Sequence, residues 1–253
     1  MADTWNPAQY ERFRAERAQP FHDLLALVEP RPDMSAIDLG CGTGDMTLLL
    51  HQKLKARETL GIDRSPAMLA KAPSADGLRF QEADIASFKG GPYDLIFSNA
   101  ALHWVPDHPG LLRKLRSMLA PGGQLAVQMP AGDEDAAHVT ARELARSHEF
   151  KPLLNGFSAR DPLLEPQQYA GWLHALGFKR QHVRVQVYAH LLDDRMQVVE
   201  WVRGALLTDY QRRLPPKAFE RFLRAFTDRL LPQLADDQPF LYLQPRLLFW
   251  GAL

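Results

Sequence analysis

Short apolar runs alternate with helix-like patterns of apolar residues over residues 34–130. Short runs that end at glycine, proline or acidic residues are typical of buried strands, whereas apolar residues three or four positions apart are typical of helices. This alternation predicts an α/β fold, in which a doubly wound, mostly parallel sheet carries helices on both faces. The expected strands are 35–40, 59–63, 78–84, 93–99 and 124–130, and the expected helices are 45–54, 65–72 and 109–123.

The pattern changes after Pro130. Residues 133–150 and 165–176 are expected to be helical. In 181–192, valines alternate with polar residues, which is the period of a half-exposed strand. The C-terminal run 240–253 is again strand-like, so the sheet is expected to have seven strands in all.

Helical patterns fill the stretch between these last two strands. The helix expected near the end of this stretch has a stripe of apolar residues along one face. We expect this stripe to pack on the core rather than to bind a ligand. Its members are Phe219, Phe222, Leu223, Phe226 and Leu230. We therefore predict a single domain, 1–253, with a helical stretch between its last two strands.

The composition is ordinary for a globular protein. The chain has 253 residues, and 30 Lys and Arg balance 30 Asp and Glu, so no broad basic field exists to attract nucleic acid or anionic lipid. The only cysteine is Cys41, which excludes an intramolecular disulfide and a metal site made of several cysteines. The polar N-terminus is unlike a signal peptide, and no apolar run is long enough to span a membrane. We expect a cytoplasmic protein, a monomer with a small-molecule partner and no metal.

Three glycines, Gly40, Gly42 and Gly44, alternate with other residues directly after the first strand. The dinucleotide fingerprint G-x-G-x-x-G would place its third glycine where this chain has Asp45. Asp38, at the end of the strand, would also repel a pyrophosphate. A cationic cofactor without phosphate reverses this argument, and S-adenosylmethionine is such a cofactor. The alternative, a tight turn without a ligand, stays open.

Acidic residues follow the next two expected strands as well. Asp63 stands where an acid accepts hydrogen bonds from ribose hydroxyls. Asp84 can accept the adenine amino group, with Ile85 and Met68 as apolar covers for the ring. Taken singly, each acid could instead be a helix cap or a surface charge. The complete set of candidate cofactor-binding residues is Arg17, Asp38, Gly40, Cys41, Gly42, Gly44, Asp63, Arg64, Met68, Asp84, Ile85 and Asn99.

The motifs "DLGCGTGD", "GIDRSPAML", "EADI" and "DLIFSNAALHWVPD" resemble those of class I, seven-stranded S-adenosylmethionine-dependent methyltransferases. The segments "WNPAQYERFRAERAQP", "SNAALHWVPDH", "LAVQMP" and "PRLLFW" resemble the subgroup that methylates trans-aconitate, over nearly the whole length. The resemblance implies a Rossmann-like methyltransferase domain whose seventh strand is antiparallel. It also implies methyl transfer to a carboxylate of trans-aconitate or a related small polycarboxylic acid. It implies in addition that the helical stretch 190–240 is a cap inserted before the last strand, which would roof the pocket, and that an N-terminal helical segment, 1–30, would cover the cofactor.

A carboxylate acceptor is ionised at neutral pH, so the reaction needs alignment and exclusion of water rather than a general base. His103, after the fourth strand, is the best candidate base if the acceptor is a hydroxyl. Its alternative role is to orient the acceptor. Trp104 is expected to wall the pocket or to pack in the core.

Substrate-binding candidates come from two further segments. Tyr10, Arg14 and Arg17 share one face of the N-terminal helix pattern, which could equally be an exposed charged face. Trp201 and Arg203 belong to the expected cap. Two other classes stay open at this point, a nicotinamide-dependent oxidoreductase and a cofactor-binding module without catalysis.

Overall fold

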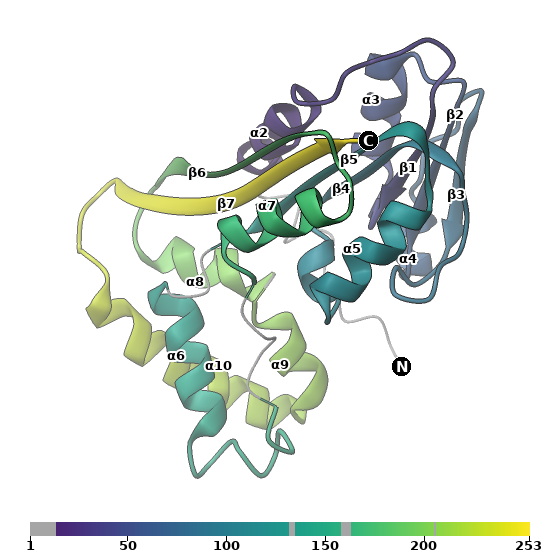
Figure 1. Cartoon of the computed structure of the whole chain (residues 1–253). Helices are drawn as coiled ribbons and strands as arrows, with labels where there is room; N and C mark the ends of the chain where they lie inside the picture. The colour runs from purple at the N-terminus through teal and green to yellow at the C-terminus, as the bar shows by residue number, and fades with distance from the viewer. Residues whose placement is uncertain (1–13, 132–134, 158–162, 205) are drawn as a thin grey trace. The chain divides into compact units, whose positions relative to one another are not determined.

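The chain forms one seven-stranded sheet in the order β3-β2-β1-β4-β5-β7-β6 (Figure 1). This computed structural model describes residues 14–131, 135–157, 163–204 and 206–253, with side-chain surroundings from residue 18 onward. The strands are β1 (Ser35–Leu39), β2 (Glu58–Asp63), β3 (Leu78–Glu82), β4 (Tyr93–Asn99), β5 (Leu119–Pro130), β6 (Arg180–Leu192) and β7 (Phe240–Ala252). The first five pair in parallel, and β7 pairs antiparallel with β5. The doubly wound, mostly parallel sheet expected from the sequence is confirmed.

Local signals fix several helix starts. The Ser65 hydroxyl accepts a hydrogen bond from the Met68 N–H, and Pro66 opens the helix that follows. A serine followed by proline at the start of a helical pattern predicts this cap from the sequence alone. The helices near the sheet are α2 (Arg14–Leu25), α3 (Asp45–Leu54), α4 (Pro66–Leu69), the 3₁₀ helix η1 (Leu102–Trp104), α5 (His108–Ser117) and α7 (Pro166–Ala175). The others are α6 (Ala136–Arg146), α8 (Met196–Arg203), α9 (Thr208–Arg213), α10 (Pro216–Leu230) and the 3₁₀ helix η2 (Leu231–Gln233).

One helix boundary differs from the prediction. The helix expected at 109–123 ends at Ser117, and β5 begins at Leu119. Leu119 is buried and pairs with Tyr93, so a core position and a strand partner override the helical pattern. The proline and glycines that follow create a shift in strand register instead of a helix end.

The chain divides into two compact units, a sheet unit and a helical unit. The sheet unit comprises 17–131, 163–186 and 246–253, and the helical unit includes 135–157, 187–204 and 206–245. In the helical unit the expected apolar stripe of α10 is packed: the Phe222 ring lies 5.0 Å from Phe150 and 4.9 Å from Tyr210. The cover at 1–30 and the roofing role of 190–240 stay predictions. Among the described helices, none combines the length and the apolar character that a bilayer crossing demands.

The two faces of the sheet differ in chemistry. Side chains alternate along each strand. One face is apolar and forms a single core with α5 and α7. Its strand members include Ile37, Leu39, Ile96, Leu125, Val127, Leu247 and Phe249. Figure 1 shows α5 and α7 on this side and α2 and α3 on the other. We call the opposite side the α2 face, because Phe21 of α2 contacts Phe97 there at 5.3 Å between ring centroids.

Candidate functional site

The glycine loop joins β1 to α3 and is held by the end of β2. The N–H groups of Gly40 and Cys41 donate to the Ile62 carbonyl at 2.8 and 3.0 Å. The Gly42 N–H donates to the Asp63 carboxylate at 3.0 Å. The φ angles of Gly40, Gly42 and Gly44 are 79°, 56° and 79°. Residues that carry a side chain rarely adopt such positive φ angles. These glycines are therefore required by the backbone path.

The loops after β1 and β4 approach each other closely. A Cβ added to Gly40 would lie 2.2 Å from the Cβ of Ala101, which follows β4. β1 lies between β2 and β4, and the chain reverses its direction across the sheet there. The carboxyl edge at such a switch point is where doubly wound sheets bind ligands. The glycine loop thus lies at the position expected of a cofactor site.

Asp38 is a buried acid on the α2 face, with only 4% of its surface exposed. Its carboxyl group accepts a hydrogen bond from the Thr47 hydroxyl of α3 at 2.6 Å. Burial raises the pKa of Asp38 to about 7, helped by the charge of Asp63 and opposed by the Thr47 hydrogen bond. A cation beside Asp38 would favour the ionised form of this carboxyl group. A phosphate would instead be repelled by the carboxylates of Asp38 and Asp63.

Cys41 shares this environment. Burial, followed by the charges of Asp38 and Asp63, raises the pKa of the Cys41 thiol. The thiol therefore stays protonated at neutral pH, which argues against a nucleophilic role. The predicted role of Cys41 in cofactor binding stays a prediction.

Asp63 has a structural role that the sequence did not indicate. One carboxylate oxygen holds the Gly42 N–H, and the other accepts from the Ser65 N–H at 2.9 Å. A carboxylate oxygen can accept more than one hydrogen bond, so binding of ribose hydroxyls by Asp63 is compatible with this role and stays a prediction. Arg64, next in the chain, is exposed.

Asp84 organises the loop after β3. Its carboxylate accepts from the N–H groups of Ala86 and Ser87 at 2.8 and 3.3 Å. The Lys114 ammonium of α5 donates to the carbonyls of Ile85 and Ala86, both at 2.8 Å. Burial lowers the pKa of Lys114. Sequence reasoning missed Lys114, since nothing local links α5 to this loop. Adenine binding by Asp84 stays a prediction.

The two predicted apolar covers lie beside the glycines. The Met68 methyl carbon lies 3.2 Å from the position of a Cβ on Gly42, and Ile85 Cδ1 lies 3.6 Å from that on Gly40. Met68 is buried. The structure thus brings segments after β1, β2 and β3 together around one edge of the sheet.

Three candidates follow or end β4. The side-chain oxygen of Asn99 is buried and has no hydrogen-bond partner within the described part of the chain. His103 is 6% exposed, and its ring lies 4.7 Å from that of Trp104. All three belong to the sheet unit, near the loop that Gly40 contacts. Their roles toward an acceptor stay predictions.

The remaining candidates are not brought to this edge by the described contacts. Tyr10 lies outside the described residues, and so do the side chains of Arg14 and Arg17. Trp201 packs inside the helical unit, 5.5 Å from Tyr242 and 5.0 Å from His190 between ring centroids. Arg203 is half-exposed and lies 3.8 Å from Glu200, a contact within one helix.

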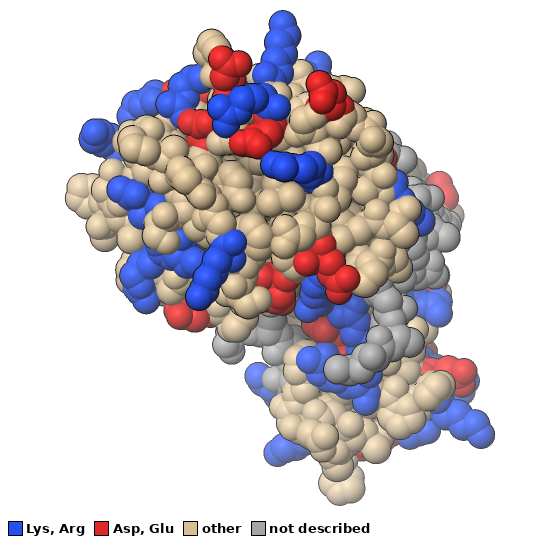
Figure 2. All heavy atoms as spheres, turned by 90° about the vertical axis from the view of Figure 1, so that its right-hand side faces the viewer, with Lys and Arg blue, Asp and Glu red and all other residues tan. Residues whose placement is uncertain are grey.

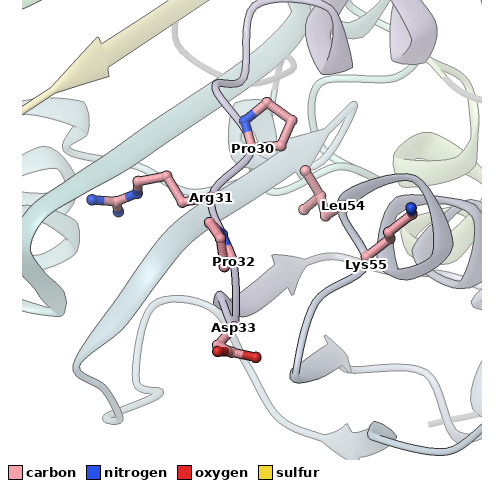
Figure 3. Close-up of a pocket in the computed structure, with 6 residues that line it drawn as sticks. All are labelled: Pro30, Arg31, Pro32, Asp33, Leu54 and Lys55. Atoms are coloured by element: carbon pink, nitrogen blue, oxygen red, sulfur yellow. The ribbon is translucent and has the colours of Figure 1, made fainter.

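A surface hollow of about 460 Å³ lies elsewhere in the sheet unit. It is lined by Pro30, Arg31, Pro32, Asp33, Leu54 and Lys55, which Figure 3 shows as sticks. These residues precede β1 and β2, so the hollow is at the amino edge of the sheet, away from the glycine loop. It is not part of the candidate site.

The surface charge agrees with the balanced composition. Figure 2 shows Lys and Arg interspersed with Asp and Glu on the face that it presents. Such mixed charge does not create the extended positive field that nucleic-acid binding relies on.

Known proteins resemble this chain over most of its length. Residues 10–183 match the family described as "Methyltransferase domain". A trans-aconitate 2-methyltransferase of Deinococcus radiodurans is 39% identical, with 97% of each chain covered. One of Methylobacterium nodulans is 40% identical, with 95% of each covered. One of Escherichia coli is 38% identical over 98% of this chain and 97% of that one.

Solved structures share the fold. YcgJ of Bacillus subtilis is 17% identical with a TM-score of 0.59, covering 92% of this chain and 97% of that one. Phosphoethanolamine N-methyltransferase 2 of Haemonchus contortus, solved with phosphomonomethylethanolamine and S-adenosylhomocysteine, is 16% identical with a TM-score of 0.55. It is covered over 52% of its chain, against 92% of this one. At these identities the likeness concerns the fold alone.

We predict that Gly40→Ala lowers the free energy of unfolding by about 1–3 kcal/mol, because the alanine would adopt a positive φ and clash with Ala101. Urea unfolding measures the change. Gly171→Ala is the matched control: its new methyl meets nothing within 4 Å, so stability should be kept or increased. Equal stability of Gly40→Ala and the native protein would contradict the close approach of the two loops.

The burial of Asp38 predicts a specific dependence of stability on pH. Between the unfolded pKa of 3.8 and the folded value of about 7, the folded state holds a proton that the unfolded state has released. This group therefore destabilises the fold progressively as pH rises through that window. The free energy of unfolding of Asp38→Asn, relative to that of the native protein, should rise by ~1 kcal/mol per pH unit within this window and stay constant above it. Urea unfolding at several pH values measures the difference, and parallel curves would contradict the buried acid.

Proposed function

The chain belongs to the methyltransferase domain family, and on that premise we propose that it methylates a small polycarboxylic acid of the trans-aconitate type. The methyl donor is S-adenosylmethionine, and the acceptor atom is a carboxylate oxygen. The buried acid Asp38 beside the glycine loop carries the donor assignment. The acceptor class is supported by relatives at 38–40% identity that are named trans-aconitate 2-methyltransferases.

The residues at the carboxyl edge fit this cofactor. When bound, S-adenosylmethionine supplies a methyl group activated by a positively charged sulfur. Burial keeps the carboxyl group of Asp38 partly protonated. The ammonium group of the cofactor would stabilise the ionised form of this carboxyl group. Gly40 and Gly42 have no Cβ, so their backbone admits a ligand at short distance. Met68 and Ile85 provide apolar surface next to them.

The chemistry asks little of proton-transferring residues. A carboxylate oxygen forms the bond to the methyl carbon, the carbon–sulfur bond breaks, and its electron pair stays on sulfur. The acceptor is already ionised at neutral pH, so no protein base is required. The chain contributes alignment and exclusion of water. His103 and Trp104, which follow β4, orient the acceptor and wall its site in this proposal.

The proposal includes a setting for the enzyme. It acts in the cytoplasm as a monomer on a small acid, without nucleic acid or membrane as a partner. The balanced charge supports this, because neither polyanions nor anionic lipid are attracted by a neutral chain.

Turnover to S-adenosylhomocysteine across a panel of acceptors tests the proposal. The panel contains tricarboxylates such as trans-aconitate, dicarboxylates, monocarboxylates, phenols and amines. We expect methyl esters of the polycarboxylic acids. Activity on phenols or amines with none on any acid would overturn the acceptor assignment. Binding of NAD in place of S-adenosylmethionine, measured by calorimetry, would overturn the donor assignment.

A further inference from the structure

A row of polar side chains crosses the α2 face near the carboxyl edge. The strand register gives the order: Asp38 of β1 pairs with Phe97, and two positions later Asn99 of β4 pairs with Gln128 of β5. Arg246 of β7 pairs with Pro130, two positions beyond Gln128. Paired residues share a face, and so do residues two apart on one strand. Asp38, Asn99, Gln128 and Arg246 therefore lie on the same side.

In the middle of this row, hydrogen-bonding groups lack partners among the residues that the structure describes. Gln128 is 1% exposed, and within the described residues its side-chain nitrogen has no hydrogen-bond partner. The buried side-chain oxygen of Asn99 likewise has no hydrogen-bond partner within these residues. Leaving a buried polar group without a hydrogen bond is unfavourable, so such a donor and acceptor mark a place that a polar ligand completes.

The ends of the row have opposite charge. Asp38 lies at the β1 end and Arg246, which is 8% exposed, at the β7 end. Three strand spacings of about 4.8 Å and an offset of four residues along the strands, at about 3.3 Å each, separate them, roughly 19 Å in all. A guanidinium stays ionised and offers five N–H donors, so it can bind a carboxylate in a bidentate manner in addition to contacts within the protein.

We propose that Arg246 and Gln128 form the acceptor's carboxylate-binding site, so that Arg246 selects acids with two or more carboxylates. This inference rests on the proposed function. Arg246 binds a carboxylate other than the one that is methylated, because a bidentate guanidinium would weaken the nucleophile it holds. The Gln128 amide nitrogen donates to the same acid between Arg246 and the methyl donor. The cation-binding end, at Asp38, and the anion-binding end are thus separated on one face.

Arg246→Gln is the first test, with steady-state kinetics on a polycarboxylic and a monocarboxylic acceptor. We expect KM for the polycarboxylic acid to rise about 10- to 100-fold, with kcat and the Kd of S-adenosylmethionine changed less than about twofold. KM for the monocarboxylic acid should stay unchanged, so discrimination between the two is lost. Arg246→Lys should restore part of the preference, because it keeps the charge but not the bidentate geometry. The matched control is Arg79→Gln, whose side chain is 72% exposed.

Gln128→Met keeps the test decisive if Arg246→Gln does not fold. Removing an amide whose buried nitrogen has no partner within the described residues should change thermal stability little, yet raise KM for the polycarboxylic acid about tenfold. Unchanged KM in both variants, in an enzyme that methylates acids, overturns the inference while the proposed function stands. So does a parallel loss of cofactor binding, which would indicate a structural role. If the native enzyme methylates no acid at all, the proposed function itself fails.

Discussion

A carboxyl group buried at the end of β1 must either keep its proton or meet a positive charge, and the site is built around that constraint. Asp38 meets no cationic side chain in the contacts described; a neutral hydroxyl, that of Thr47, donates to it. The neighbouring Asp63 adds negative charge while it holds the glycine loop. A cationic, phosphate-free cofactor relieves this arrangement, whereas a dinucleotide would aggravate it.

Much of this was readable from the sequence, because it depends on short-range signals. The Ser65 cap and the strand–helix alternation are local features, and the structure confirms them. The positive φ angles of the loop glycines are a finding of the structure. The boundary between α5 and β5 was predicted wrongly, since pairing of Leu119 with Tyr93 decides it. Propensity gives no information about a partner strand far away in the chain.

The contacts that complete the site are long-range and were missed. Thr47 reads as an ordinary helical residue, and only folding brings it to Asp38. Lys114 reads as the polar side of a helix, yet it fastens the loop after β3. Gln128 and Arg246 are polar residues within apolar runs of the sequence. A polar residue in such a run was the one sequence feature that could have indicated a functional role for them. The match to the methyltransferase family, 10–183, includes Gln128 but ends before Arg246. Of the two residues proposed to bind the acceptor, only Gln128 therefore lies in the part of the chain that this family shares.

The charge of Asp38 is the central claim, and proton release on cofactor binding tests it most directly. Calorimetric titration of S-adenosylmethionine at about pH 6.5, in two buffers of different ionisation enthalpy, measures the protons released. A carboxyl with a pKa of about 7 is largely protonated there and ionises beside the cofactor. We predict release of a fraction of a proton in the native protein and none in Asp38→Asn. Binding without proton release in the native protein, or equal release in both, would contradict the account.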